Sequence, residues 1–207
     1  LATYASKRLF KPMRPGQTSF WQNYEKFFVS QQKSFFGAAA TKDNDWAYEY
    51  LPKFDASYDT LKIIDMMAAG QMNGLFAQGL NVLLAAPDKG KVQSGLAKLK
   101  WLVTIDPLDT ETARFWENHG EYNNVDPKKI QTEVIQLPAT AFAEDEGSFT
   151  NSSRVIQWHW KAADGPGESR SDIRIVSELF ARVRALYAKD GGAFPDPILK
   201  LTWNYTT

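Results

Sequence analysis

The sequence predicts an α/β fold in which a small, mostly parallel sheet lies between helices, in a Rossmann-like three-layer α/β/α arrangement with an N-terminal helical extension. Two observations lead to this prediction. Short apolar segments alternate with amphipathic, helix-like segments between residues 58 and 160, and this order is typical of βαβ units. The apolar run Trp101–Ile105 also ends abruptly on Asp106 and Pro107, as a buried parallel strand does. We therefore expect a helical, aromatic-rich lead-in over residues 1–57 and a Rossmann-like domain over residues 58–207.

The individual elements follow from caps, glycines and periodicity. Strands are expected at residues 74–77, 101–105 and 131–137, with two shorter ones at 148–150 and 155–159. Helices are expected at residues 60–69, 88–99, 110–116 and 171–189, the first of them capped by Ser57 or Asp59 and closed by Gly70. In the helix at 171–189, the inward side is expected to carry Ile173, Val176, Leu179, Val183, Leu186 and Tyr187.

The N-terminal part is predicted to be helical and peripheral. Thr18 is a candidate cap for an aromatic helix that runs to Phe36 and ends at Gly37, and a short aromatic helix is expected at residues 46–51. Aromatic residues at helical spacing indicate packing against a partner surface more often than ligand stacking.

Composition excludes several classes of protein. The 207 residues contain 43% hydrophobic residues, which supports a real core, and 24 basic and 24 acidic residues, so the net charge is zero. A neutral chain gives no electrostatic case for nucleic acid or acidic membranes. The absence of Cys excludes disulfides, thiolate metal sites and iron–sulfur ligation within this segment. No apolar run has the length of a membrane span. The start at Leu1 suggests a mature product or an excised piece.

Two polar bends are the candidate binding sites. Gly79 and Asn81 follow the first strand, and Asp106 and Thr110 follow the second. Ligands dock at the carboxyl ends of strands in open α/β sheets, where a glycine allows close approach to the backbone and a carboxylate accepts N–H or ribose hydroxyl donors. Ordinary turn and helix-cap chemistry explains the same residues, and the usual glycine-rich dinucleotide fingerprint is missing.

Other polar residues point to no complete active site. The run Glu144–Glu146 reads as a solvated acidic turn, since no further ligands accompany it at metal-binding spacing. His119 and His159 lack partners at such spacing, and His159, between two tryptophans, is expected to be structural. We predict no catalytic residue and no metal ligand in this segment.

Three ordered motifs resemble the molybdopterin-dependent oxidoreductases. They are FAQGLN at residues 76–81, VTIDPLDTETARFW at residues 103–116, and a long run from Val134 to Gly167 that contains LPATAFAEDEGSFTN. The QWHWKAADGPG stretch and YDTLKI at residues 58–63 are similar to the large catalytic subunit of respiratory formate dehydrogenases, of which this chain looks like an internal fragment.

The resemblance implies a function for the fragment. Such subunits oxidise formate to CO2 with molybdenum or tungsten held by two molybdopterin guanine dinucleotides, and an iron–sulfur cluster lies in another domain. Gly79 and Asn81 would line the pyrophosphate or pterin side of one dinucleotide, and Asp106 and Thr110 would hold its guanosine end. Glu146 and Asn151 match the motif but would shape the loop.

The same resemblance implies what this segment lacks. The metal-ligating residue and the catalytic residues belong elsewhere in the family's chain, so the fragment alone would be inactive. The implied partners are the remaining domains of the subunit and an iron–sulfur beta subunit, and the implied location is the periplasm. Two alternatives stay open: the same domain of a nitrate- or sulfoxide-converting relative, and a non-enzymatic interaction module.

Overall fold

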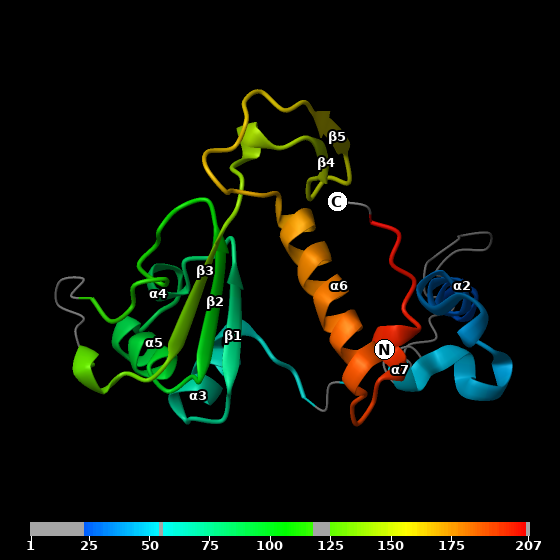
Figure 1. Cartoon of the computed structure of the whole chain (residues 1–207), viewed down its shortest axis with the longest axis horizontal. Helices are drawn as coiled ribbons and strands as arrows, with labels where there is room; N and C mark the ends of the chain where they lie inside the picture. Colours follow the sequence, from blue (N-terminus) through cyan, green and yellow to red (C-terminus); the bar gives the residue numbers. More distant parts are fainter. Residues whose placement is uncertain (1–22, 54–55, 118–124, 206–207) are drawn as a thin grey trace, which may run out of the picture. The chain divides into compact units, whose positions relative to one another are not determined.

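The computed structural model describes residues 23–53, 56–117 and 125–205 (Figure 1). The predicted cap Thr18 and His119 lie outside these residues. Two compact units are present: the described parts of Leu1–Asp55 and Leu179–Thr207 form the first, and Ala56–Glu178 the second. The domain boundary expected at residue 57 stays a prediction.

The second unit contains a three-stranded parallel sheet in the order β1–β2–β3. Its strands are β1 (Gly74–Gln78), β2 (Trp101–Asp106) and β3 (Glu133–Pro138). The register pairs Gly74 with Trp101 and Trp101 with Glu133, so all three strands end at the same edge. The α/β fold with a small parallel sheet is therefore confirmed.

One face of the sheet carries the main core, against three helices that lie together in Figure 1: α3 (Thr60–Ala68), α4 (Val82–Ala85) and α5 (Lys89–Leu96). Met67, Val92 and Leu96 are completely buried against Leu102 of β2. Asp59 caps α3 by accepting a hydrogen bond from the Lys62 N–H at 2.8 Å, as the sequence predicts.

The opposite face of the sheet meets the first turns of α6 (Asp172–Asp190). Ile175 of that helix packs with Val103 and Ile105. The predicted inward position Ile173 is wrong, because its side chain is 51% exposed while Ile175 is 8% exposed. The helix is rotated relative to the prediction because Arg170, just before it, pairs with Ala139, the residue after β3.

The helix expected at residues 110–116 is also wrong, since residues 111–116 form consecutive turns. The N–H groups of Ala113 and Glu117 donate to carbonyls three residues earlier, at 2.9 Å each. The physical reason is the Thr112 side chain, which leaves the local backbone and bonds to the bend after β1. The four-residue α4 in that bend was not predicted.

The two shorter predicted strands are confirmed as an antiparallel hairpin of β4 (Gly147–Thr150) and β5 (Ile156–His159). The short helices η4 (Pro127–Lys129) and η5 (Phe142–Glu144) precede β3 and β4. Asn151 shapes the hairpin loop, because its Oδ1 accepts the N–H groups of Ser153 at 2.9 Å and Val155 at 3.2 Å.

The first unit is helical. It contains α2 (Tyr24–Phe36), η2 (Gly37–Ala39), η3 (Lys42–Tyr50) and α7 (Asp196–Leu199), together with the end of α6. As predicted, α2 ends before Gly37, whose φ is +52°. Phe36 is buried and packs edge-on against Tyr50 at 5.2 Å between ring centroids, so the aromatic residue at this helix end belongs to a core.

A left-handed turn lies inside η3, because residues 45–47 all have positive φ. Gln32 of α2, which is fully buried, donates from Nε2 to the Trp46 and Ala47 carbonyls at 2.9 and 3.2 Å. Left-handed conformations cost about 1–2 kcal/mol per non-glycine residue, so Gln32 stabilises a strained turn.

Candidate functional site at the carboxyl edge of the sheet

The bends after β1 and β2 are tied together at the carboxyl edge of the sheet. Asn81 Nδ2 donates to Glu111 Oε2 at 2.6 Å, and Asn81 Oδ1 accepts from Thr112 Oγ1 at 2.8 Å. Thr112 Oγ1 also accepts the Leu83 N–H at 3.0 Å. Asn81 therefore uses both ends of its amide to hold one bend against the other.

Gly79 leaves its backbone open. Its φ is +59°, and no other heavy atom lies within 4 Å of the place where a Cβ would be. Its N–H donates to the Ile105 carbonyl at 2.9 Å. The residue extends the β1–β2 ladder and presents an unobstructed Cα side, as a backbone contact with a ligand requires.

Asp106 and Thr110 lie on the second bend. Asp106 Oδ1 accepts the Leu108 N–H at 2.9 Å, and within the described part of the chain the structure records no partner for its Oδ2. Thr110 is half-buried, and its carbonyl accepts the Ala113 N–H. The structure thus brings all four predicted residues to one edge, with Asn81 in a positioning place between the bends.

A cavity of about 340 Å³ lies at the same edge, between the bend after β2 and the bend after β3. Most of its walls are apolar, and its two polar residues are Glu144 and Ser169; the lining is Pro107, Leu108, Pro138, Ala139, Ala141, Glu144, Pro166 and Ser169. An apolar cavity with few polar groups is the usual form of a small-molecule site.

Ser169 was missed by the sequence reasoning. Its Oγ is buried without a hydrogen-bond partner among the described residues, as is Thr140 Oγ1 nearby. A Cβ on Gly165 would lie 2.5 Å from Ser169 Oγ, so glycine is needed for this close approach. Buried polar atoms are normally paired, so the unpaired hydroxyl is a distinctive feature of this wall of the cavity.

Glu144 has a structural bond of its own. Its Oε2 accepts the Ala141 N–H at 2.8 Å, so the residue expected to be a solvated acidic turn fixes the start of η5. Nearby, the Asp164 carboxylate bonds Lys161 at 2.5 Å and raises the pKa of that amine, with smaller contributions from Glu146 and Asp145.

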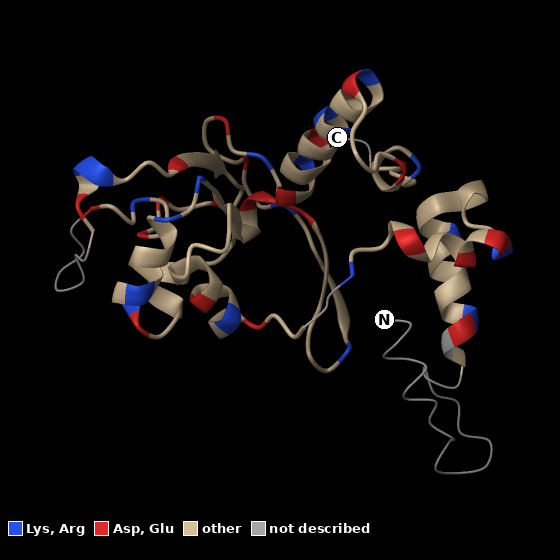
Figure 2. Cartoon of the chain, turned by 90° about the horizontal axis from the view of Figure 1, so that it is seen from below, with Lys and Arg blue, Asp and Glu red and all other residues tan. Residues whose placement is uncertain are grey.

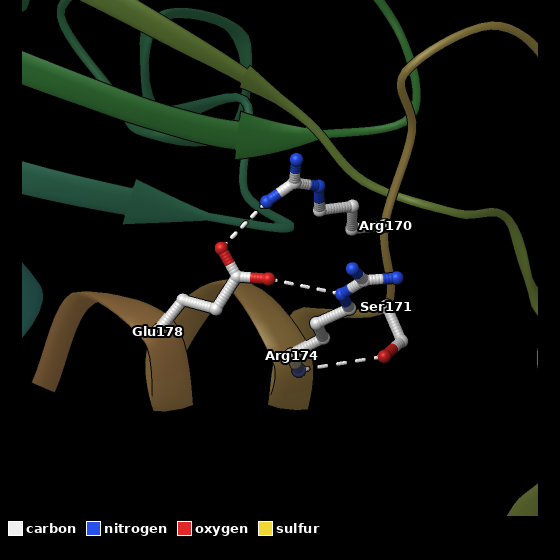
Figure 3. Close-up of polar contacts among 4 residues, drawn as sticks. All are labelled: Arg170, Ser171, Arg174 and Glu178. Carbon is white, nitrogen blue, oxygen red and sulfur yellow. Dashed lines mark hydrogen bonds and ion pairs between the residues drawn. The ribbon is translucent and has the colours of Figure 1, made fainter. Parts of the chain in front are cut away.

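An ion-pair network lies at the start of α6, next to the carboxyl edge of the sheet (Figure 3). Glu178 of α6 accepts from Arg170 Nη1 at 2.6 Å and from Arg174 Nε at 3.0 Å. The Arg170 backbone donates to the Pro138 carbonyl at 3.1 Å, and Asp172 accepts from Gln78 Nε2 at 2.7 Å. The start of α6 is therefore fixed to the ends of both β1 and β3.

Lys and Arg positions are interspersed with Asp and Glu positions along the chain in each unit (Figure 2), and the net charge of the sequence is zero. In residues 23–53, 56–117 and 125–205, no three His, Asp or Glu side chains are grouped to hold a metal ion. His159 stacks on Phe142 at 4.1 Å between centroids, which agrees with a structural histidine.

Part of this edge matches a known protein family. Residues 133–182, which include β3 and the start of α6, match the molybdopterin oxidoreductase family. The predicted resemblance to the molybdopterin oxidoreductases is confirmed.

Relatives that share 40–53% sequence identity with this chain are formate dehydrogenase subunits. The chain is 53% identical to the formate dehydrogenase-O major subunit of Escherichia coli (strain K12) over 99% of this chain and 20% of the relative. It is 48% identical to the formate dehydrogenase major subunit of Haemophilus influenzae over 94% of this chain and 19% of the relative. It is 40% identical to formate dehydrogenase 2 subunit alpha (cytochrome c-553) of Nitratidesulfovibrio vulgaris over 89% of this chain and 18% of the relative.

The chain therefore spans about a fifth of the length of these relatives. It is similar over nearly its whole length to formate dehydrogenase major subunits, and its residues 133–182 match the molybdopterin oxidoreductase family. Within its described residues, no helix is both long and apolar enough to cross a bilayer.

Proposed function

We propose that this chain is the segment of a formate dehydrogenase catalytic subunit that holds one molybdopterin guanine dinucleotide at the carboxyl edge of β1–β3. The observation that carries the proposal is the joining of the two polar bends by Asn81, together with the open backbone of Gly79. Both features lie where open α/β sheets bind nucleotides.

The residues present fit such a ligand. Gly79 allows the pyrophosphate or pterin side to approach the backbone, and Asp106 has a carboxylate oxygen to accept from the guanosine end, next to Thr110. The cavity beside Asp106 supplies mostly apolar walls for a planar group. Asn81 acts by positioning the two bends, because its own amide is used by Glu111 and Thr112.

The chemistry in the proposed parent protein is formate oxidation to CO2. The bound cofactor, with its molybdenum or tungsten, supplies the two-electron redox chemistry. The residues of this segment bind the cofactor, orient it and exclude water from one side of it. They include no candidate catalytic group, and the chain has no Cys for an iron–sulfur cluster. We propose that the segment alone is inactive and that the parent's cluster is bound elsewhere.

The proposal extends to partners and location. The remaining domains of the parent subunit and an iron–sulfur beta subunit are the proposed partners, and the periplasm is the proposed compartment. Support comes from the relatives, which are named as major or alpha subunits and are about five times as long as the matched segment.

Cofactor content tests the proposal in the full subunit. Asp106→Ala removes a carboxylate acceptor, and a hydrogen bond to a charged group contributes about 1.5–3 kcal/mol, so affinity should fall by about 10- to 150-fold. Pterin released from purified protein is measured by fluorescence. Glu133→Ala is the control, because this exposed carboxylate lies at the amino edge of the sheet, at the other end of the strands from Asp106. Wild-type pterin content in Asp106→Ala would remove Asp106 from the site.

A second test uses the guanosine end alone. Millimolar GDP should raise the melting temperature of the chain, since a ligand that binds only the folded state stabilises it. An unchanged melting temperature with GDP would contradict guanosine binding at this edge.

A further inference from the structure

The hairpin of β4 and β5 presents a row of large apolar side chains on one face. Ile156 and Trp158 lie on the same side of β5, because side chains alternate along a strand, and Trp160 directly follows the end of that strand. They are 74%, 56% and 76% exposed, and the two indole rings meet edge-on at 5.7 Å. Their cross-strand neighbours are small, because Trp158 pairs with Ser148 and Ile156 with Thr150.

The other face of the hairpin carries a small aromatic cluster, in which Phe142 is 66% exposed and Phe149 is 41% exposed. Phe142 lies against His159 at 4.1 Å and against Phe149 at 5.9 Å between ring centroids. The row of Ile156, Trp158 and Trp160 takes no part in this aromatic cluster. A two-stranded hairpin has marginal stability by itself, and exposed tryptophans are typical of the energetic centre of an interface. The row therefore has the properties of a contact surface.

The composition and size of the row indicate what covers it. Residues 155–160 read VIQWHW, without Lys, Arg, Asp or Glu, as in the core of a permanent interface. The exposed parts of the row amount to about 400 Å², whereas a stable interface between separate proteins buries about 800 Å² on each partner. So small an apolar contact can form between two parts of one polypeptide, because their covalent connection gives each a high effective concentration near the other.

We propose that the Ile156–Trp158–Trp160 row packs against another domain of the same polypeptide. The inference rests on the proposed function, in which this segment belongs to a full-length subunit. The relatives support it, since the matched segment, hairpin included, is 20% of a chain that continues for the other four-fifths. A second copy and a separate subunit are the competing occupants.

The test is site-specific photo-cross-linking in the full polypeptide. Trp158→p-benzoylphenylalanine is irradiated, and the cross-linked peptides are identified by mass spectrometry. We expect cross-links within one chain to peptides outside these 207 residues. Gln157→p-benzoylphenylalanine is the matched control, because Gln157 is the neighbouring residue on the opposite face and should not give those peptides. A Trp160→p-benzoylphenylalanine protein replaces the first variant if that one does not fold.

Each other result overturns the inference. These results are a cross-linked dimer of the chain, a cross-link to another subunit, and the absence of any cross-link beyond the 207 residues. Pterin content of the same preparations reports on the proposed function separately. If the expected cross-links form in a protein that contains no pterin, the interface is supported and the cofactor role is contradicted. If the protein contains pterin but the cross-link joins two copies of the chain, the cofactor role is supported and the interface is contradicted.

Discussion

The bond between the two bends predicts that Thr112→Val destabilises the protein strongly for a change of one polar atom. Thr112 is 1% exposed, and its hydroxyl both donates to Asn81 at 2.8 Å and accepts the Leu83 N–H at 3.0 Å. Valine has nearly the same shape, so no cavity is created. Only the two hydrogen bonds are lost.

The magnitude follows from the two bonds. A neutral hydrogen bond contributes about 0.5–1.5 kcal/mol net, and a buried donor left without an acceptor costs about 1–3 kcal/mol. Leu83 is 3% exposed, so water does not replace the hydroxyl. The free energy of unfolding should fall by about 2–4 kcal/mol, and with a urea m-value of about 2–3 kcal/mol/M the midpoint should fall by about 1 M.

Urea titration followed by circular dichroism measures the change. Thr110→Val is the matched control, because it makes the same substitution at the half-buried start of the turn and should leave the midpoint nearly unchanged. If Thr112→Val and Thr110→Val unfold at the same urea concentration as the unchanged chain, Thr112 does not join the bends and the positioning role of Asn81 is wrong.

Three further changes test the packing within the two units. Gly95→Ala should lower the unfolding free energy by about 1–3 kcal/mol by overpacking, since its Cβ would lie 3.2 Å from a backbone nitrogen of α3; equal or higher stability in urea would contradict this packing. Lys91 lowers the pKa of Asp65 below 3.8, so their pair stabilises the fold above that pH and is lost as the pH falls through the lowered pKa. The stability difference between the unchanged chain and Lys91→Met should vanish in acid, and a pH-independent difference would exclude the pair. Gln32→Met removes both hydrogen bonds to the turn at 45–47 but also removes the Gln32 Oε1, which is buried without a partner among the described residues, so the loss of stability should be about 1–2 kcal/mol. An unchanged melting temperature would contradict this role of Gln32.

Local signals in the sequence predicted the local structure well. Asp59 caps α3 because a side-chain acceptor three residues before an N–H satisfies an otherwise unpaired donor, and this bond depends on nothing distant. Gly37 and Gly70 end helices with φ of +52° and +70°, a conformation that favours glycine. The parallel strand β2 follows from its largely apolar run between Trp101 and Ile105.

Distant contacts explain the failures. Residues 110–116 carry a helix-like pattern, but Thr112 bonds to residues about 30 positions earlier, and no local pattern contains that information. Ile175 faces the sheet in place of Ile173 because Arg170 joins β3. Of the candidate site, the two bends were found from their position after strands, and their binding roles stay predictions. Ser169 could not be found, since a serine in a polar loop becomes distinctive only when its hydroxyl is buried.

The strand order has a consequence for how the chain behaves during synthesis. β1 lies at one side of the sheet, with a strand neighbour only in β2 among the described residues, and its sequence GLFAQ has no charge or proline to discourage pairing with other chains. β3 at the other side begins with Glu133 and ends with Pro138. Because β2 follows β1 by more than twenty residues, β1 leaves the ribosome with both its hydrogen-bonding edges bare, and this strand is where nascent copies would aggregate.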